Sequence, residues 1–214
     1  MRILAAISIS ALALFAGSSA ASQSAPDWFR SYMASPGYRQ YLEIVFNKME
    51  PPPLKAQCPA LKLSGVNFGS IVVAPTYVTV NGLKYIESGT WIARVYFDAC
   101  GKKVARRALL KAVGGPNHVV EPTSLLPGDF RGDLRLEADA KRIVLPGIMG
   151  EAHCGDWSTL YVLDIVSSDP PGSDKWREVW TAQACGTLVK SDVTYWRDDV
   201  RHGINISTTT HPNE

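Results

Sequence analysis

The chain has 214 residues, of which 46% are hydrophobic and 20% are charged, with 22 basic and 20 acidic side chains. A balance this close to neutral creates no electrostatic attraction to nucleic acid or to an anionic membrane surface, so neither is expected as a partner. A chain of this length can bury a substantial core, as one large domain or two small ones.

Residues 1–21 have the layout of a secretory signal peptide. Arg2 supplies a positive charge, an apolar run extends from Ile3 to Ala16, and small residues follow as far as Ala21. The apolar run is too short to cross a membrane comfortably. We therefore expect cleavage after Ala20 or Ala21, no membrane span after cleavage, and a secreted or periplasmic mature protein.

The mature chain contains four cysteines, Cys58, Cys100, Cys154 and Cys185. In an exported protein four cysteines predict two disulfide bonds, because the compartment is oxidising. Zinc sites generally need closely spaced cysteine pairs, and this sequence has none, so we expect no metal. Three disulfide pairings remain open on the number of cysteines alone.

A repeated phrase favours one of these pairings. "ACGKKV" at residues 99–104 returns as "ACGTLV" at residues 184–189, and each copy has a tryptophan nine residues before its cysteine. If each half of the chain is a copy of one unit, each unit contains its own disulfide. The repeat therefore predicts the pairs Cys58–Cys100 and Cys154–Cys185.

Residues 22–57 predict an N-terminal helical segment followed by a proline linker. Apolar residues recur at helical spacing on both sides of Pro36-Gly37, which interrupts the helix. The prolines at 51–53 end the second helical piece, and we expect them to form a stiff extended linker.

Residues 58–123 predict a first β unit. "SIVVA" and "TYVTV" read as strands, and Asn81-Gly82 is the strongest short signal for a hairpin. Residues 91–99 and 104–111 are expected to form a second hairpin around Cys100-Gly101. Residues 104–111 also contain helix formers, but their alignment with the second copy of the repeat favours a strand. The basic residues of 102–111 are expected on a solvated face, and residues 115–117 in a turn.

Residues 124–150 predict a turn at 126–129 and a connecting helix near 131–143. Residues 151–214 predict a second β unit, with strands in "STLYVLDIVS", around Cys185-Gly186 and in "GINISTTT". The expected fold is mostly β with minor helices (α+β minor). It consists of two disulfide-closed antiparallel β units that arise from an internal duplication and pack into one body around a shared core.

The sequence offers only weak candidates for catalysis. His153 and Asp156 flank Cys154, but neighbouring residues on a strand point to opposite faces, so His153 cannot easily activate the Cys154 sulfur. The sequence contains no nucleotide-binding, phosphate-binding, GxSxG or HExxH motif, so no cofactor is expected. His153, Asp156 and Glu178 remain as weak catalytic candidates, and the protein is expected to be non-enzymatic.

Two tryptophans could serve either a core or a ligand surface. Trp176 and Trp180 flank Glu178 in a predicted strand, where a carboxylate beside an indole shelf could orient a polar ligand. The alternative is a core position, because tryptophan beside a disulfide recurs in the cores of β-sandwich domains. Burial of both indoles would exclude the ligand surface.

Residues 120–207 resemble a group of exported bacterial proteins. The shared features are the "LLPGD" segment, the later cysteine, "VLDI", and the phrase "WREVWTAQACG" before a closing strand. The chain departs from this pattern at residues 197–203, where those proteins usually have an acidic turn with two glycines. The resemblance implies a cell-envelope protein and transfers no catalytic residue.

These observations lead to a first hypothesis and two alternatives. The first is a non-enzymatic binding or structural module of the cell envelope, whose partner is an envelope protein or a polysaccharide. The alternatives are a small exported hydrolase with a site in the groove between the two β units, and assembly through an edge strand. A pocket that brings ionisable groups within hydrogen-bond reach would favour the hydrolase, whereas an exposed apolar patch would favour the binding module.

Overall fold

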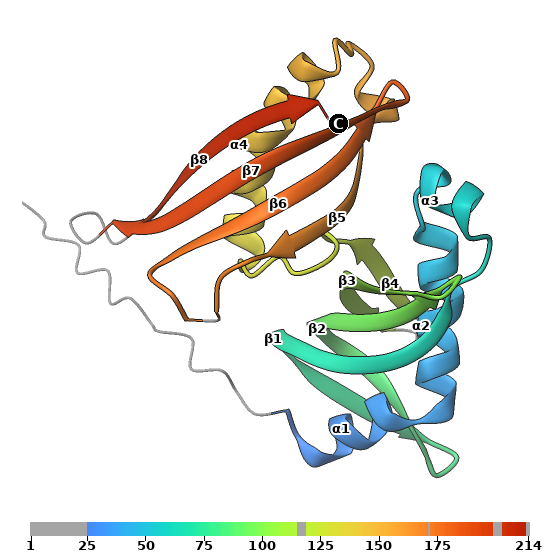
Figure 1. Cartoon of the computed structure of the whole chain (residues 1–214). Coiled ribbons are helices and arrows are strands. Elements are labelled where there is room, and N and C mark those ends of the chain that lie inside the picture. Colours follow the sequence, from blue (N-terminus) through green and yellow to red (C-terminus); the bar gives the residue numbers. More distant parts are fainter. Residues whose placement is uncertain (1–24, 115–118, 171, 199–202, 213–214) are drawn as a thin grey trace, which may run out of the picture.

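The computed structural model describes residues 25–114, 119–170, 172–198 and 203–212. Within them the chain forms two four-stranded antiparallel sheets, each with helices on one face (Figure 1), which confirms the expected mostly-β class with minor helices. The predicted signal peptide at 1–21 and the predicted turn at 115–117 lie outside the described residues.

The two halves of the chain contain the same order of elements. The first half has three helices, α1 (Asp27–Ala34), α2 (Pro36–Met49) and α3 (Pro52–Gln57), and then the strands β1 (Lys62–Val80), β2 (Leu83–Ala99), β3 (Lys102–Val113) and β4 (Val119–Ser124). The second half has α4 (Leu134–Glu151) and a short 3-10 turn at Trp157–Thr159, and then β5 (Tyr161–Ser167), β6 (Lys175–Ala184), β7 (Thr187–Asp198) and β8 (Gly203–Pro212). In each sheet the strands lie in chain order. This arrangement is what an internal duplication predicts.

The repeated Cys-Gly phrase forms the turn between the second and third strand of each sheet. Ala99 pairs with Lys102 and Ala184 with Thr187, so each turn contains only the Cys-Gly pair. Backbone φ is +53° and +86° in the first turn and +50° and +83° in the second, as a type I′ hairpin requires at both central positions.

The disulfides are Cys58–Cys100 and Cys154–Cys185, which confirms the predicted pairing. Each bond joins the segment that follows a helix to the tip of a hairpin in the same half of the chain. Two disulfides also indicate an oxidising, non-cytoplasmic compartment.

The proline run does not form the expected extended linker. Pro51 precedes α3, and Pro52 and Pro53 occupy its first turn. Proline is tolerated there because the first N–H groups of a helix have no acceptor within the helix, and its fixed φ is already helical. A run of prolines can therefore begin a helix as well as separate two elements.

The predicted connecting helix is longer than expected. Instead of ending near residue 143, α4 continues through Pro146 to Glu151. Its second half buries Val144 and Ile148 against the second sheet, and Gly147 lies so close to β8 that a Cβ would be 3.0 Å from Thr210 Oγ1. Packing therefore outweighs the signals of Pro146 and Gly147 to end the helix.

The prediction that the basic residues of 102–111 lie on a solvated face is wrong for two arginines. Arg106 and Arg107 are only 7% and 6% exposed. As neighbours on a strand they point to opposite faces of the first sheet. Arg106 donates two hydrogen bonds to the Glu50 carboxylate, from Nε at 2.9 Å and from Nη2 at 2.5 Å. Arg107 forms an ion pair with Glu137 of α4 at 3.3 Å.

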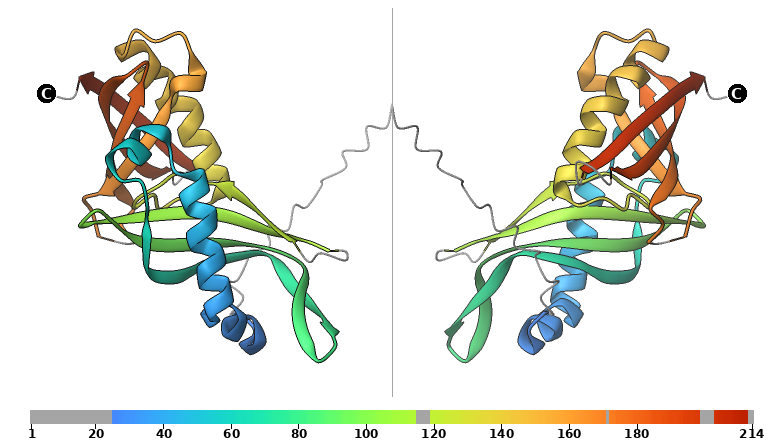
Figure 2. Two further views of the ribbon diagram at one scale, coloured as in Figure 1. Left: turned by 90° about the vertical axis from the view of Figure 1, so that its right-hand side faces the viewer. Right: turned by 90° about the vertical axis from the view of Figure 1, so that its left-hand side faces the viewer.

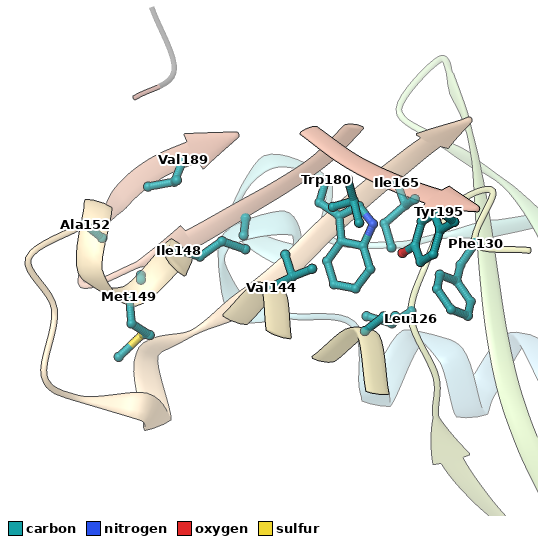
Figure 3. Close-up of a cluster of buried hydrophobic side chains, with 14 of the residues drawn as sticks. Leu126, Phe130, Val144, Ile148, Met149, Ala152, Ile165, Trp180, Val189 and Tyr195 are labelled. Carbon is teal, nitrogen blue, oxygen red and sulfur yellow. The ribbon is translucent and has the colours of Figure 1, made fainter. Parts of the chain in front are cut away.

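Each sheet has its own hydrophobic core, in place of the expected shared one. In the first half, α1 and α2 cover a cluster that includes Trp91 and Phe97. In the second half, α4 packs on a cluster around Trp180 and Tyr195 (Figure 3). The expectation of a shared core is therefore wrong, because helices of the same half of the chain cover each sheet.

A segment that we name the strap, residues 125–133, joins the halves. The backbone N–H of Gly128 donates to Ala105 O of β3 at 3.0 Å, and the N–H of Asp129 donates to Ile165 O of β5 at 2.7 Å. Arg94 of β2 donates to Gly128 O and forms an ion pair with Asp129. The strap is therefore hydrogen-bonded to both sheets, which fixes one half against the other.

We expect Gly128→Ala to lower the free energy of unfolding by about 1–3 kcal/mol. Gly128 has φ +67°, and a Cβ would lie 2.2 Å from Ile165 O, so the strap and β5 would have to separate. Urea unfolding measures the change. Gly172→Ala is the matched control, since Gly172 has φ +87° and no atom within 4 Å of its Cβ position. An equal loss of unfolding free energy in both variants would contradict the steric argument, because the strain of a positive φ would then explain both results.

Candidate functional site

The structure does not combine His153, Asp156 and Glu178 in one site. His153 and Asp156 are exposed in the loop after α4, whereas Glu178 contacts Arg131, which precedes α4. The 18 residues of α4 separate these two places by roughly 27 Å along the helix. Asp156 accepts hydrogen bonds from the Ser158 backbone and hydroxyl, which lower the pKa of this carboxyl. Cys154 is in a disulfide and has no thiol to act as a nucleophile.

The suggested ligand surface at Trp176 and Trp180 is wrong, because both indoles are buried. They are 9% and 0% exposed, and Glu178 between them is 1% exposed. These alternate positions of β6 all face the core. Glu178 accepts hydrogen bonds from Trp180 Nε1 at 3.1 Å and from the Arg131 backbone N–H at 3.2 Å. Burial raises the pKa of Glu178, and these bonds partly oppose the rise.

A cleft of about 680 Å³ lies between the two halves of the chain. We name it the inter-sheet cleft; it is lined by residues 48–52 and 55, by residues 124–127, by Lys141, and by residues 160–162. These segments are the end of α2, the beginning of α3, the beginning of the strap and the start of β5, which is the end away from its arrowhead in Figure 1. The volume is in the range of about 300–1,000 Å³ that is typical of small-molecule sites.

Three lysines line the inter-sheet cleft, and two of them have no acidic partner. Lys48 and Lys55 are exposed and form no ion pair with the described part of the chain. Lys141 lies 2.6 Å from Glu137, a carboxylate that is shared with Arg107. The one acidic residue of the lining, Glu50, is neutralised by the buried Arg106. The cleft therefore has a clear excess of positive charge.

Among the described residues that line the inter-sheet cleft, no hydrogen bond joins a nucleophile to a base. Its residues include no histidine or cysteine. The Ser124 hydroxyl lies 3.4 Å from the neighbouring carbonyl oxygen of Leu125, to which it donates. Glu50 is occupied by both nitrogens of the Arg106 fork. Nucleophilic catalysis needs a base that is hydrogen-bonded to the nucleophile, and the described lining has no such bond between Ser124 or Tyr161 and one of its three lysines.

A second hollow, of about 540 Å³, lies at the other end of the strap, along residues 130–133, and its lining includes Arg94, Arg107 and Arg131. Each guanidinium is already held by the protein. Arg94 pairs with Asp129, Arg107 with Glu137, and Arg131 donates to backbone carbonyls of the β5–β6 loop. These arginines connect the strap to the sheets. Because their positive charges are already paired within the protein, this hollow offers less free positive charge to a ligand than the inter-sheet cleft does.

The β1–β2 hairpin extends beyond the rest of the first sheet (Figure 2) and carries exposed apolar side chains. Val72, Val73, Val80 and Leu83 are each at least 40% exposed. β1 is also an outer strand of its sheet. This is where the expected edge-strand assembly would take place, but nothing in the structure indicates what would cover the hairpin.

In the described residues we find no group of three or more histidine, cysteine or acidic side chains that could hold a metal ion. The same part of the chain has no helix that is both long enough and apolar enough to cross a membrane. Comparison with protein-family models, with curated proteins and with solved structures finds no match.

Sequence reasoning missed the inter-sheet cleft completely. Its three lysines are separated by up to 93 positions, between Lys48 and Lys141, and belong to no motif. They line one cavity because α2, α3 and α4 all pass beside the strap. No local signal in the sequence indicates this juxtaposition.

Proposed function

We propose that the protein is an exported, non-enzymatic binding module that holds a small ligand in the inter-sheet cleft. The observation that carries the proposal is a cleft of about 680 Å³ whose described lining combines lysines with apolar side chains and has no hydrogen-bonded pair of nucleophile and base. Export is supported by the signal-peptide layout of residues 1–21 and by the two disulfides.

The hydrolase alternative receives less support. Its candidates His153 and Asp156 lie in an exposed loop, and Glu178 is buried in the second core. None of the three lines the inter-sheet cleft. We therefore retain one function for this groove, the reversible binding of a ligand.

The test is to block the cleft and measure retention of a bound molecule. Ser124 is exposed in the lining, so Ser124→Trp would fill the opening without disturbing a core. We expect native mass spectrometry of gently purified protein to detect a bound small molecule on the wild type and not on this variant. Ser207→Trp, at an exposed position of β8, is the matched control and should retain the molecule.

Two outcomes would contradict the proposal. The first is a wild-type protein that carries no molecule, or a Ser124→Trp variant that carries the same molecule equally well. The second is turnover of ester, glycoside or peptide substrates by the wild type that Ser124→Trp abolishes, since this would make the cleft an active site.

A further inference from the structure

We infer that the ligand of the inter-sheet cleft is a single-chain anionic amphiphile, with an acyl-type chain and a carboxylate or phosphate head group. This inference rests on the proposed function and specifies its ligand. It is derived from two properties of the lining, its uncompensated positive charge and its apolar floor.

The positive charge selects an anion. Lys48, in the last turn of α2, and Lys55, in the last turn of α3, form no ion pair within the described residues. Lys141 adds a third ammonium group, since its partner Glu137 already compensates Arg107. Lysine presents a compact charge on a flexible stem, so it can follow either a carboxylate or a phosphate without the fixed geometry of arginine.

The apolar floor selects a chain attached to that anion. Met49, Leu125, Leu126, Leu160 and Val162 line the cleft, together with three prolines. A bare inorganic anion would leave these side chains uncovered, whereas a hydrocarbon chain would remove them from water.

A smaller cavity of about 50 Å³ continues the floor inward. It shares Met49, Leu125 and Val162 with the cleft and adds the buried side chains of Phe46 and Leu163. The paired side chains of Glu50 and Arg106 also border it. Lys48 and Lys55 are exposed on their helices, whereas Leu126 is buried and Leu125 and Val162 are half-buried. This order suits a molecule that enters chain first and keeps its head group at the opening.

The charges that could compete for the lysines are already neutralised. Glu50 is 7% exposed and bound by Arg106 through two nitrogens. Glu137 is 3% exposed and, in addition to its two cationic partners, accepts from the Leu126 backbone N–H at 2.8 Å. An incoming anion therefore meets Lys48 and Lys55, whose charge is used by no ion pair within the described residues.

The test uses calorimetric titration of the whole mature protein with defined amphiphiles below their critical micelle concentration. Oleate and lysophosphatidylglycerol represent the carboxylate and phosphate sources. Oleyl alcohol and lysophosphatidylcholine are the uncharged and zwitterionic controls, and inorganic phosphate is the control without a chain. We expect both anionic amphiphiles to bind about tenfold or more tightly than the controls.

The variants assign the binding to the lysines. Lys48→Gln/Lys55→Gln is expected to weaken oleate binding by about tenfold or more, and Lys141→Gln should weaken it further. Lys62→Gln/Lys175→Gln is the matched control, because both positions are exposed and lie outside the cleft. Ser124→Trp should abolish binding of either anionic amphiphile.

The outcomes separate this inference from the proposed function. Equal binding of charged and neutral amphiphiles, or no effect of the lysine variants, would overturn the anionic ligand and keep the cleft as a binding site. If the copurified molecule is lost in Ser124→Trp but is not an amphiphile, the inference about the ligand is likewise overturned and the cleft remains a binding site. Binding to phosphatidylglycerol vesicles that Ser124→Trp leaves unchanged would overturn the inference in favour of a membrane surface. No binding of any probe or copurified molecule would overturn both.

Discussion

Glu137→Ala is expected to lower the free energy of unfolding by about 3–5 kcal/mol, because it leaves a buried charge without a partner. Glu137 is 3% exposed and is bound by three groups: the Leu126 backbone N–H at 2.8 Å, Lys141 Nζ at 2.6 Å and Arg107 at 3.3 Å. Burial lowers the pKa of the Arg107 guanidinium, and the Glu137 carboxylate opposes this shift. Arginine keeps its proton in proteins, so the variant would retain an uncompensated cation.

Two further variants isolate the cause of that loss. Asp139→Asn lies on the same helix, where Asp139 forms only an exposed contact of 3.8 Å with Arg142, and we expect a change within about 0.5 kcal/mol. Arg107→Met/Glu137→Met removes both charges together and should recover most of the stability that Glu137→Ala loses. Chemical denaturation of all three variants measures the difference. A double variant no more stable than Glu137→Ala would contradict the role of the unpaired charge.

Removal of one disulfide is expected to destabilise one half of the molecule. Cys154→Ser/Cys185→Ser opens a loop with a sequence separation of 31 residues. Restriction of the unfolded chain by a loop of this size is worth about 3.7 kcal/mol in the chain-entropy argument, and the corresponding value for Cys58–Cys100 is about 4 kcal/mol. Since each half has its own core, we expect the loss to be concentrated in the half that contained the bond.

Native-state hydrogen exchange resolves this prediction by segment. In Cys154→Ser/Cys185→Ser, the slowest amides of residues 134–198 should exchange faster by roughly two to three orders of magnitude, while those of residues 25–113 should change little. Cys58→Ser/Cys100→Ser is the reciprocal variant and should give the opposite pattern. Equal acceleration in both halves would instead indicate that the strap couples them into one cooperative unit.

The features that the sequence predicted well are local. Asn81-Gly82, Cys100-Gly101 and Cys185-Gly186 all form two-residue turns with positive φ, because glycine at the second position makes a type I′ turn accessible. The disulfide pairing followed from the same repeated phrase. These predictions succeeded because residues a few positions apart determine the geometry.

The features that the sequence did not predict depend on distant partners. The helix α4 continues past Pro146 because Ile148 is buried against a sheet that is formed later in the chain. Arg106 is buried because Glu50, 56 residues earlier, accepts from its guanidinium. The same reason applies to the three lysines of the inter-sheet cleft. Each is an ordinary surface residue of its own helix, and they line one cleft only because the two halves pack together.

The location of the disulfides also determines how the protein would respond to a mechanical load. A force applied at the two ends of the chain bypasses the loops closed by Cys58–Cys100 and Cys154–Cys185, which span 42 and 31 residue steps. At about 3.4 Å per extended residue, roughly 250 Å of contour length stays out of reach of the force until the sulfur bonds are reduced. The whole of β1, β2, β5 and β6 lies within these loops. Under tension the two disulfide-closed loops would therefore stay closed while residues 101–153 between them extend, and the extensibility of the protein would depend on the redox state of its surroundings.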